Sequence, residues 1–142
     1  MENIHATCIA LNNRGILLTG ASGSGKSDLA LRMILEKGAV LIADDRTDIR
    51  RGANRPVASC PETIKGLLEV RGVGIVTPPA QAETEVFLVA ELVSSLAEIE
   101  RLPAPETTLI CGYPVKKIKL YPFELSAAHK LTLACDEKSE AG

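Results

Sequence analysis

A glycine-rich segment, Gly20-Ala21-Ser22-Gly23-Ser24-Gly25-Lys26-Ser27, constrains this chain more than any other feature. It matches the pattern G-x-x-x-x-G-K-[ST] at every fixed position. Its glycines allow successive backbone N–H groups to surround an anion, and a helix that starts at Lys26 directs its positive end at the same point. In this pattern the lysine reaches the β- and γ-phosphates and the hydroxyl ligates Mg²⁺. We therefore predict that residues 20–27 bind a nucleoside triphosphate with Mg²⁺.

The sequence on either side of this segment has the periodicity that the motif requires. Two short apolar runs, 7–11 and 16–19, are joined by an Asn/Gly turn and predict a hairpin. Apolar residues with helical spacing predict a helix over 26–37, which Gly38 ends. A strand, a phosphate-binding loop and a helix are expected in that order. The alternative is a loop-to-helix turn with incidental glycines.

The rest of the chain combines short strands with few helices. Expected strands cover 40–43, 67–70, 86–92, 107–110 and 115–120, with a second hairpin in 46–57, a helical turn in 61–66, a loop over 77–84, a short helix over 94–101 and an amphipathic helix over 123–135. No internal repeat or linker divides the chain. We expect one domain over 1–135 and a polar, disordered tail over 136–142.

Two aspartates, Asp44 and Asp45, follow the apolar run 40–43. Ligands of open α/β sheets sit at the carboxyl ends of strands, so this pair is expected near the phosphate loop. Phosphoryl transfer to a hydroxyl needs a carboxylate to accept the proton, and the metal needs acidic support. One aspartate for each role is a natural division, and a pair that caps a turn is the alternative. Glu69 follows another apolar run and could reach Mg²⁺, although a solvated strand end is typical of such a residue.

Composition excludes several other classes of function. Aromatic residues make up only 3% of the 142 residues, and the net charge is −2 with 16 basic and 18 acidic residues. A nucleic-acid partner is therefore not expected, because such proteins present basic patches or stacking surfaces. No apolar run approaches the roughly 20 residues of a membrane span, and the first residues are not a secretory signal. The four cysteines are scattered, which indicates reduced thiols in a cytoplasmic protein.

Taken together, these motifs resemble the catalytic domain of the HPr kinase/phosphorylase family. The resemblance is strong from His5 to Ile75 and weaker over 86–134. It is carried by His5, the loop 20–27, the string Ala43-Asp44-Asp45-Arg46-Thr47-Asp48, and the string Leu68-Glu69-Val70-Arg71-Gly72-Val73-Gly74-Ile75. The last string resembles the family's own signature and is more specific than the phosphate loop. Farther along, Arg101 followed by Leu102 resembles a family Arg-Leu pair.

The resemblance implies an ATP- and Mg²⁺-dependent kinase that phosphorylates a serine of HPr, the carrier protein of the sugar phosphotransferase system, or of an HPr paralogue. It also implies a reverse reaction in which phosphate attacks the phosphoserine. The implied fold is an α/β P-loop core similar to the phosphoenolpyruvate carboxykinase-type kinase domain, with a mixed sheet, few helices and assembly into a homo-oligomer, a hexamer in the family. The positions that match family active-site residues are His5, Lys26, Asp45 and Arg101, and those that match Mg²⁺ ligands are Ser27 and Glu69. We add Asp44 to the expected metal site.

The chain also departs from the family pattern, and two other functions stay open. The family's N-terminal domain is missing from the sequence, and its Pro-Gly-Arg-Asn string is replaced by Tyr121-Pro122-Phe123-Glu124. These changes resemble short forms from some proteobacteria. One rival is a P-loop kinase of a small metabolite, with an anion site built from Arg46, Arg50, Arg51 and Arg55, although these residues suit a solvated hairpin equally. The other rival is an ATP-binding regulatory module without transfer.

Overall fold

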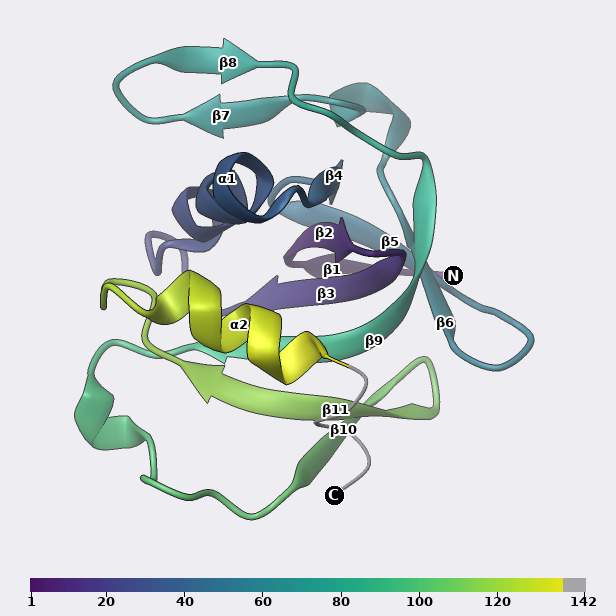
Figure 1. Cartoon of the computed structure of the whole chain (residues 1–142). Helices are drawn as coiled ribbons and strands as arrows, with labels where there is room; N and C mark the ends of the chain where they lie inside the picture. Colours follow the sequence, from purple (N-terminus) through teal and green to yellow (C-terminus); the bar gives the residue numbers. More distant parts are fainter. Residues whose placement is uncertain (137–142) are drawn as a thin grey trace.

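The computed structural model describes residues 1–136 (Figure 1). The strands are β1 (Glu2–His5), β2 (Thr7–Leu11), β3 (Arg14–Thr19), β4 (Val40–Ala43), β5 (Arg46–Arg51), β6 (Pro56–Ser59), β7 (Leu68–Val70), β8 (Gly74–Val76), β9 (Glu83–Leu92), β10 (Glu106–Ile110) and β11 (Tyr113–Leu120). The helices of the described part are α1 (Lys26–Lys37) and α2 (Ala127–Cys135), with the 3-10 turns η1 (Glu62–Ile64) and η2 (Leu96–Glu98). None of these helices is long and apolar enough to cross a membrane.

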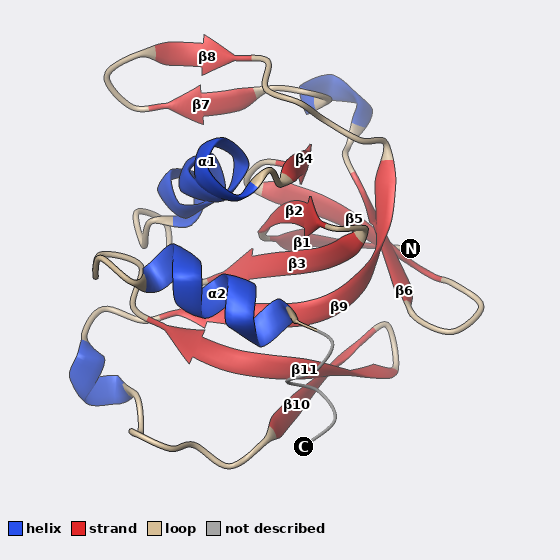
Figure 2. Ribbon diagram, in the orientation of Figure 1, coloured by secondary structure: helices blue, strands red, loops and turns tan. Residues whose placement is uncertain are grey.

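Most strands form one curled, mixed sheet around the long strand β9. The order is β1-β5-β6-β9-β3-β2-β4, and the β10–β11 pair joins it through β11 and β9. The first residues of β9 pair antiparallel with β6, and the rest of β9 pairs in parallel with both β3 and β11. Figure 2 shows the resulting bend, with strands in most of the fold and two α-helices on one side. The predicted α/β class with a mixed sheet and few helices is confirmed.

The central strands are buried on both faces, as their continuous apolar runs predict. Along β3, Ile16 and Leu18 pack in the core under α1 and α2, while Leu17 belongs to a second core on the opposite face. On the helix side, Leu29 and Leu131 are fully buried between the two helices and the sheet. Two cores of aliphatic side chains therefore fix the sheet and the helix that follows the glycine-rich loop.

The strand directions bring several strand ends to one edge of the sheet. β3, β9 and β11 run in parallel, and β2 runs antiparallel to both β3 and β4, so β4 points the same way as β3. The carboxyl ends of β4, β3 and β11 therefore lie along one edge, with the end of β3 between the other two. The segments that leave these ends carry the aspartate pair, the glycine-rich loop and the start of α2.

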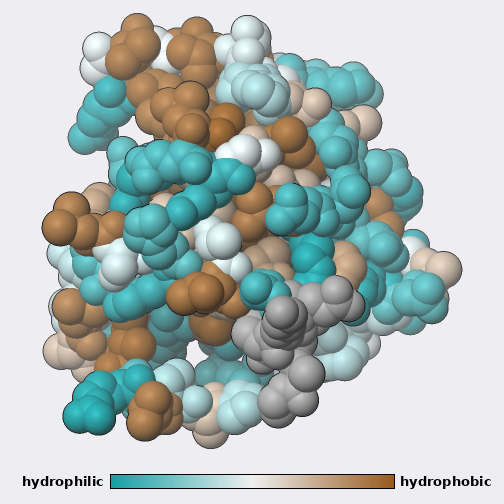
Figure 3. All heavy atoms as spheres, in the orientation of Figure 1, coloured by the Kyte–Doolittle hydropathy of each residue, from teal (hydrophilic) through white to brown (hydrophobic). Residues whose placement is uncertain are grey.

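A separate hairpin, β7–β8, lies above α1 (Figure 1). Leu68 is fully buried and anchors the hairpin to the core of α1. Val73 and Ile75, in contrast, are 76% and 67% exposed, and apolar atoms gather in this upper region of the surface in Figure 3. The hairpin is thus held by apolar contacts to this core, and the N–H of Glu69 lies beside the residue that follows β4.

The structure agrees with most predicted elements and differs at a few. β1 and β8 were not expected, because both are short and present exposed or half-buried residues without a clear alternation. The expected helix over 94–101 is only the turn η2, and the last helix begins at Ala127 instead of Phe123. The expected domain boundaries stay a prediction, and the tail over 136–142 lies outside the described residues except for Asp136.

Candidate active site

The glycine-rich loop joins β3 to α1 and adopts a conformation that requires glycine. Gly20, Gly23 and Gly25 have φ values of 138°, 79° and 104°, which L side chains rarely adopt. Gly25 is the N-cap of α1 and supplies no side-chain hydrogen bond to the helix end. The first turn of α1 therefore directs its N–H groups toward the loop without a capping side chain, which suits an anionic ligand.

Lys26 holds this loop together from the inside. Its side chain is only 6% exposed, and its ammonium group donates to the backbone carbonyls of Gly20 and Ala21, each at 3.0 Å. Ser24 Oγ is buried and has no hydrogen-bond partner among the described residues. Buried hydroxyls are nearly always paired, so this orphaned group fits a loop that receives a polar ligand.

Asp44 lies behind the loop and connects three elements. Its Oδ1 accepts hydrogen bonds from Ser27 Oγ at 2.7 Å and from Thr7 Oγ1 at 3.2 Å. Its Oδ2 accepts the backbone N–H of Glu69 at 3.3 Å. The carboxylate therefore fixes the position of the Ser27 hydroxyl and ties the β7–β8 hairpin to the end of β4.

Asp45 points away from Asp44 and toward the cavity. Its φ of 67° is in the left-handed region, an uncommon conformation for a residue other than glycine. The backbone N–H donates to Thr7 Oγ1 at 3.2 Å, and the side chain, 68% exposed, lies 2.9 Å from His5 Nε2 through Oδ1. Strained residues persist where neighbours hold them and cluster at functional sites. The two aspartates thus face different partners, as consecutive residues at a strand end are expected to do.

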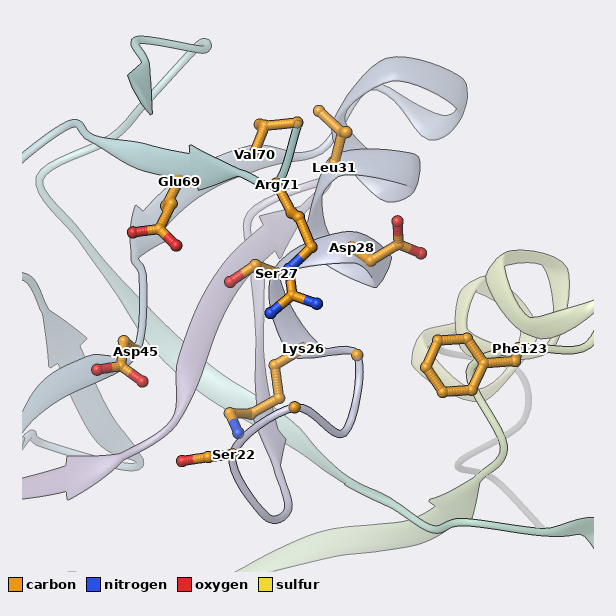
Figure 4. Close-up of a pocket in the computed structure, with 12 residues that line it drawn as sticks. Ser22, Lys26, Ser27, Asp28, Leu31, Asp45, Glu69, Val70, Arg71 and Phe123 are labelled. Atoms are coloured by element: carbon orange, nitrogen blue, oxygen red, sulfur yellow. The ribbon is translucent and has the colours of Figure 1, made fainter. Parts of the chain in front are cut away.

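These groups surround one cavity of about 440 Å³ at the edge of the sheet. Figure 4 shows Asp45 and Glu69 at one end, Lys26 and Ser27 in the middle and Phe123 at the other end, with Arg71 extending over Ser27. The lining residues are Ser22, Gly23, Gly25, Lys26, Ser27, Asp28, Leu31, Asp45, Glu69, Val70, Arg71 and Phe123. A cavity with a phosphate loop at its centre and the carboxylates of Asp45 and Glu69 at one end can bind a triphosphate and receive a hydroxyl group beside it.

The structure brings together most of the residues predicted for the site. Lys26, Ser27, Asp45 and Glu69 line the cavity, and Asp44 and His5 contact them directly. The exception is Arg101, which is exposed in the segment after η2 and does not line the cavity. Its catalytic role stays a prediction.

Five lining residues were not predicted as site residues from the sequence, namely Asp28, Leu31, Val70, Arg71 and Phe123. Arg71 was noted only as part of a signature string, and Leu31 and Phe123 were assigned to helices. The unusual string around Phe123 was the available signal, because it departs from the family pattern at a strand end. The hydroxyl of Thr7 was also missed, because nothing in the sequence distinguishes it from other strand threonines.

Three of the four arginines considered as an anion site contact other groups, each a different one. Arg50 pairs with Glu83 at 2.9 Å, and this contact raises the pKa of Arg50 and lowers that of Glu83. Arg51 stacks over Tyr113 with its guanidinium carbon 4.7 Å from the ring centre. Arg55 stacks over Phe87 in the same way at 3.7 Å. These contacts support the interpretation of a structural hairpin surface and do not favour a small-metabolite kinase.

The donor set around Ser27 fits a magnesium ion. No cluster of three or more His, Cys, Asp or Glu side chains that could hold a metal occurs in residues 1–136. Mg²⁺, however, is usually bound by one or two carboxylates together with substrate phosphates and water. A hydroxyl from Ser27 with the carboxylates of Asp44 and Glu69 meets that requirement beside a phosphate loop.

The sequence matches the family model "HPr Serine kinase C-terminal domain" over residues 1–123. The HPr kinase/phosphorylase of Lactobacillus acidophilus is 35% identical over 130 residues, which cover 84% of this chain and 40% of that protein. The HPr kinase/phosphorylase of Bordetella avium is 35% identical over 128 residues, covering 82% of this chain and 41% of that protein. The chain thus spans about two-fifths of the length of the curated relatives it matches.

A solved structure of the Hpr(Ser) kinase/phosphatase from Coxiella burnetii has the same architecture. It matches this chain with a TM-score of 0.85 at 26% sequence identity, and the match covers 100% of both chains. The similarity therefore extends over the sheet, both helices and the edge that carries the cavity.

Proposed function

Because this chain belongs to the HPr serine kinase C-terminal domain family, we propose that it transfers the γ-phosphoryl group of ATP to a serine of an HPr protein or an HPr paralogue. The observation that carries the proposal is the placement of the phosphate loop and Asp45 in a single cavity. The relatives named HPr kinase/phosphorylase support both the acceptor and a reverse reaction, in which phosphate attacks the phosphoserine and releases pyrophosphate.

The loop and the start of α1 hold the triphosphate in this proposal. The N–H groups of residues 20–27 and the positive end of α1 surround the phosphates. Lys26 exchanges its contacts with the carbonyls of Gly20 and Ala21 for contacts with the β- and γ-phosphates. Its charge offsets the negative charge that the γ-phosphoryl group carries during transfer.

Asp45 acts as the base toward the acceptor serine. Its carboxylate takes the hydroxyl proton while the serine oxygen bonds to the γ-phosphorus and the bond from that phosphorus to ADP breaks. His5, in contact with the same carboxylate at 2.9 Å, orients it. In the reverse reaction, the protonated Asp45 returns the proton to the serine oxygen as the phosphoryl group leaves.

The residues proposed to hold Mg²⁺ are Ser27, Asp44 and Glu69. Asp44 accepts hydrogen bonds from the hydroxyl of Ser27 and from the backbone N–H of Glu69. Its carboxylate therefore helps to position both of these residues. Mg²⁺ bound there would neutralise charge on the β- and γ-phosphates. Arg101 belongs to the proposal by family position, and in this structure it is exposed and does not line the cavity. A cytoplasmic location and a homo-oligomer, a hexamer by resemblance, are also proposals.

The test is phosphotransfer from labelled ATP to the organism's own HPr paralogues by the wild type and by Asp45→Asn. Asp45→Asn removes the base but keeps the side-chain size, so we expect transfer to fall by roughly 10²- to 10⁴-fold while ATP affinity changes little. Asp48→Asn is the matched control, because Asp48 does not line the cavity and its carboxylate accepts a hydrogen bond from Asn3 at 2.8 Å. Undiminished transfer by Asp45→Asn would remove Asp45 from the role of base. Transfer by the wild type to a metabolite and to no HPr paralogue would reject the acceptor.

A further inference from the structure

We propose that Phe123 forms the nucleoside end of the site and that its ring stacks against the base of the bound nucleotide. The inference rests on the proposed function, because it requires a nucleoside triphosphate in the glycine-rich loop. The phosphate motif contains no residue that contacts the base, and the inference assigns that contact to Phe123.

The strand order places Phe123 at the end of the cavity opposite Asp45. Asp45 follows β4, the glycine-rich loop follows β3, and Phe123 follows β11, with β3 lying between β4 and β11 in the sheet. In Figure 4 Lys26 accordingly lies between Asp45 and the ring of Phe123. Transfer requires the γ-phosphoryl group to face Asp45. The other end of the same molecule, the nucleoside, must then lie toward Phe123.

The ring is exposed and close to the loop. Phe123 is 59% exposed, although it lines the same cavity as Lys26. A Cβ added at Gly25 would lie 3.1 Å from Cζ of the ring, so only a glycine allows the ring to approach the loop this closely. Leu31 supplies a second apolar surface in the cavity. An exposed aromatic face is the kind of surface on which bases stack.

The segment that carries the ring is fixed to α1. The guanidinium of Arg32 donates to the backbone carbonyl of Pro122, and its Nε pairs with Asp28 at 3.3 Å. Tyr121 packs edge-on against Phe123, with the ring centres 5.8 Å apart. These contacts hold the ring before a ligand arrives, which lowers the entropic cost of binding.

A contact with the acceptor protein is the competing role for this ring. The position of neighbouring Leu125 helps to separate the two roles, because Leu125 is 100% exposed and does not line the cavity. Phe123 instead contacts the loop itself, so the observations favour the nucleotide. Leu125→Ala therefore serves as the matched control, an apolar truncation in the same segment.

The first experiment compares the binding of ATP and of inorganic tripolyphosphate by calorimetry. Phe123→Ala should weaken the binding of ATP by about 5- to 150-fold, the usual effect of losing one base–aromatic contact. The affinity for tripolyphosphate should not change. Leu125→Ala should change neither dissociation constant. An equal loss for both ligands would mean that the ring supports the loop and not a base, and would overturn the inference. A raised KM for the acceptor protein with unchanged ATP affinity would assign the ring to the acceptor and overturn it as well.

A fluorescence experiment gives a second readout that does not depend on loss of affinity. The chain contains no tryptophan, so Phe123→Trp creates a single reporter at this position. We expect ATP to quench and shift its emission and tripolyphosphate to leave it nearly unchanged. The same response to both ligands would overturn base stacking. Failure of the wild type to bind either ligand would instead reject the proposed function, which distinguishes the two failures.

Discussion

Replacing Asp44 by alanine tests whether one carboxylate organises the candidate site. Asp44 accepts three hydrogen bonds from three different parts of the chain, namely Ser27 on α1, Thr7 on β2 and the backbone of Glu69 on β7. Thr7 is fully buried and Ser27 is partly buried. Truncation of Asp44 therefore leaves these donors without their acceptor, and water can take its place only in part.

The magnitude follows from the three contacts. The 2.7 Å bond from Ser27 to a carboxylate is charge-assisted and is worth about 1.5–3 kcal/mol, and the longer bonds at 3.2 and 3.3 Å contribute about 0.5–1 kcal/mol each. Loss of Asp44 also relieves repulsion from the exposed Asp45 and Glu69, a gain of at most about 1 kcal/mol. We expect a net loss of about 3 kcal/mol in the free energy of unfolding, or about 10 °C in Tm for a chain of this length.

The assay is denaturant unfolding of wild type, Asp44→Ala, Asp44→Asn and Asp48→Ala. Asp44→Asn should be intermediate, because its amide oxygen still accepts from Ser27 while its NH₂ group cannot accept from Glu69. Asp48→Ala should stay within about 0.5 kcal/mol of the wild type, since its partner Asn3 is exposed. A loss below about 1 kcal/mol for Asp44→Ala would refute the reasoning, because the three contacts would then be worth no more than surface bonds.

Two further predictions concern the sheet. Gly15→Ala should destabilise the fold by about 1–3 kcal/mol in denaturant unfolding, because the added Cβ would overlap the backbone carbonyl of Glu85 and lie 2.6 Å from Thr84 Cγ2; wild-type stability would contradict this packing. Arg50 lowers the folded-state pKa of Glu83 below the ordinary 4.5, so their pair stabilises the fold above that value and ceases to do so as the pH falls through the lowered pKa. Melting curves of Glu83→Gln and wild type should therefore differ slightly at neutral pH and coincide in strong acid, whereas a difference that persists in acid would exclude the pair as its cause.

Local sequence patterns predicted most elements of the fold. The apolar run 40–43 corresponds to β4, because a strand buried on both faces is apolar throughout. The helical spacing over 26–37 corresponds to α1, because a helix buried on one face has apolar residues every three or four positions. β1 escaped prediction because its stability comes from pairing with β5, more than forty residues away, as in the pair Ile4 and Thr47. Strand order was equally inaccessible, since no local pattern states that β11 and β3 both pair with β9.

The candidate site likewise contains residues that a local segment determines and residues that only the assembled fold brings together. Residues within the glycine-rich loop could be predicted because one continuous segment contains the whole anion-binding geometry. Asp45 and Glu69 were expected near the loop because each follows an apolar run of strand length, but their separate roles as base and as Mg²⁺ ligand required the resemblance to a family. Their distance from the loop is set by β4 and the β7–β8 hairpin. Arg71 and Phe123 reach the cavity from a hairpin and from the end of β11, and only the assembled sheet brings them there.

The conformation of Asp45 shows why the site needs the complete sheet. A left-handed aspartate is unfavourable by itself, and its φ of 67° is held by the bond from its N–H to Thr7 Oγ1. Thr7 also donates to Asp44, so this single buried hydroxyl fixes both aspartates. His5 contacts the Asp45 side chain from the end of β1. The segment His5–Thr7 thus sets the direction in which Asp45 points, and a loop–helix fragment that contained only residues 16–45 would retain the phosphate loop but lose the alignment of its carboxylate.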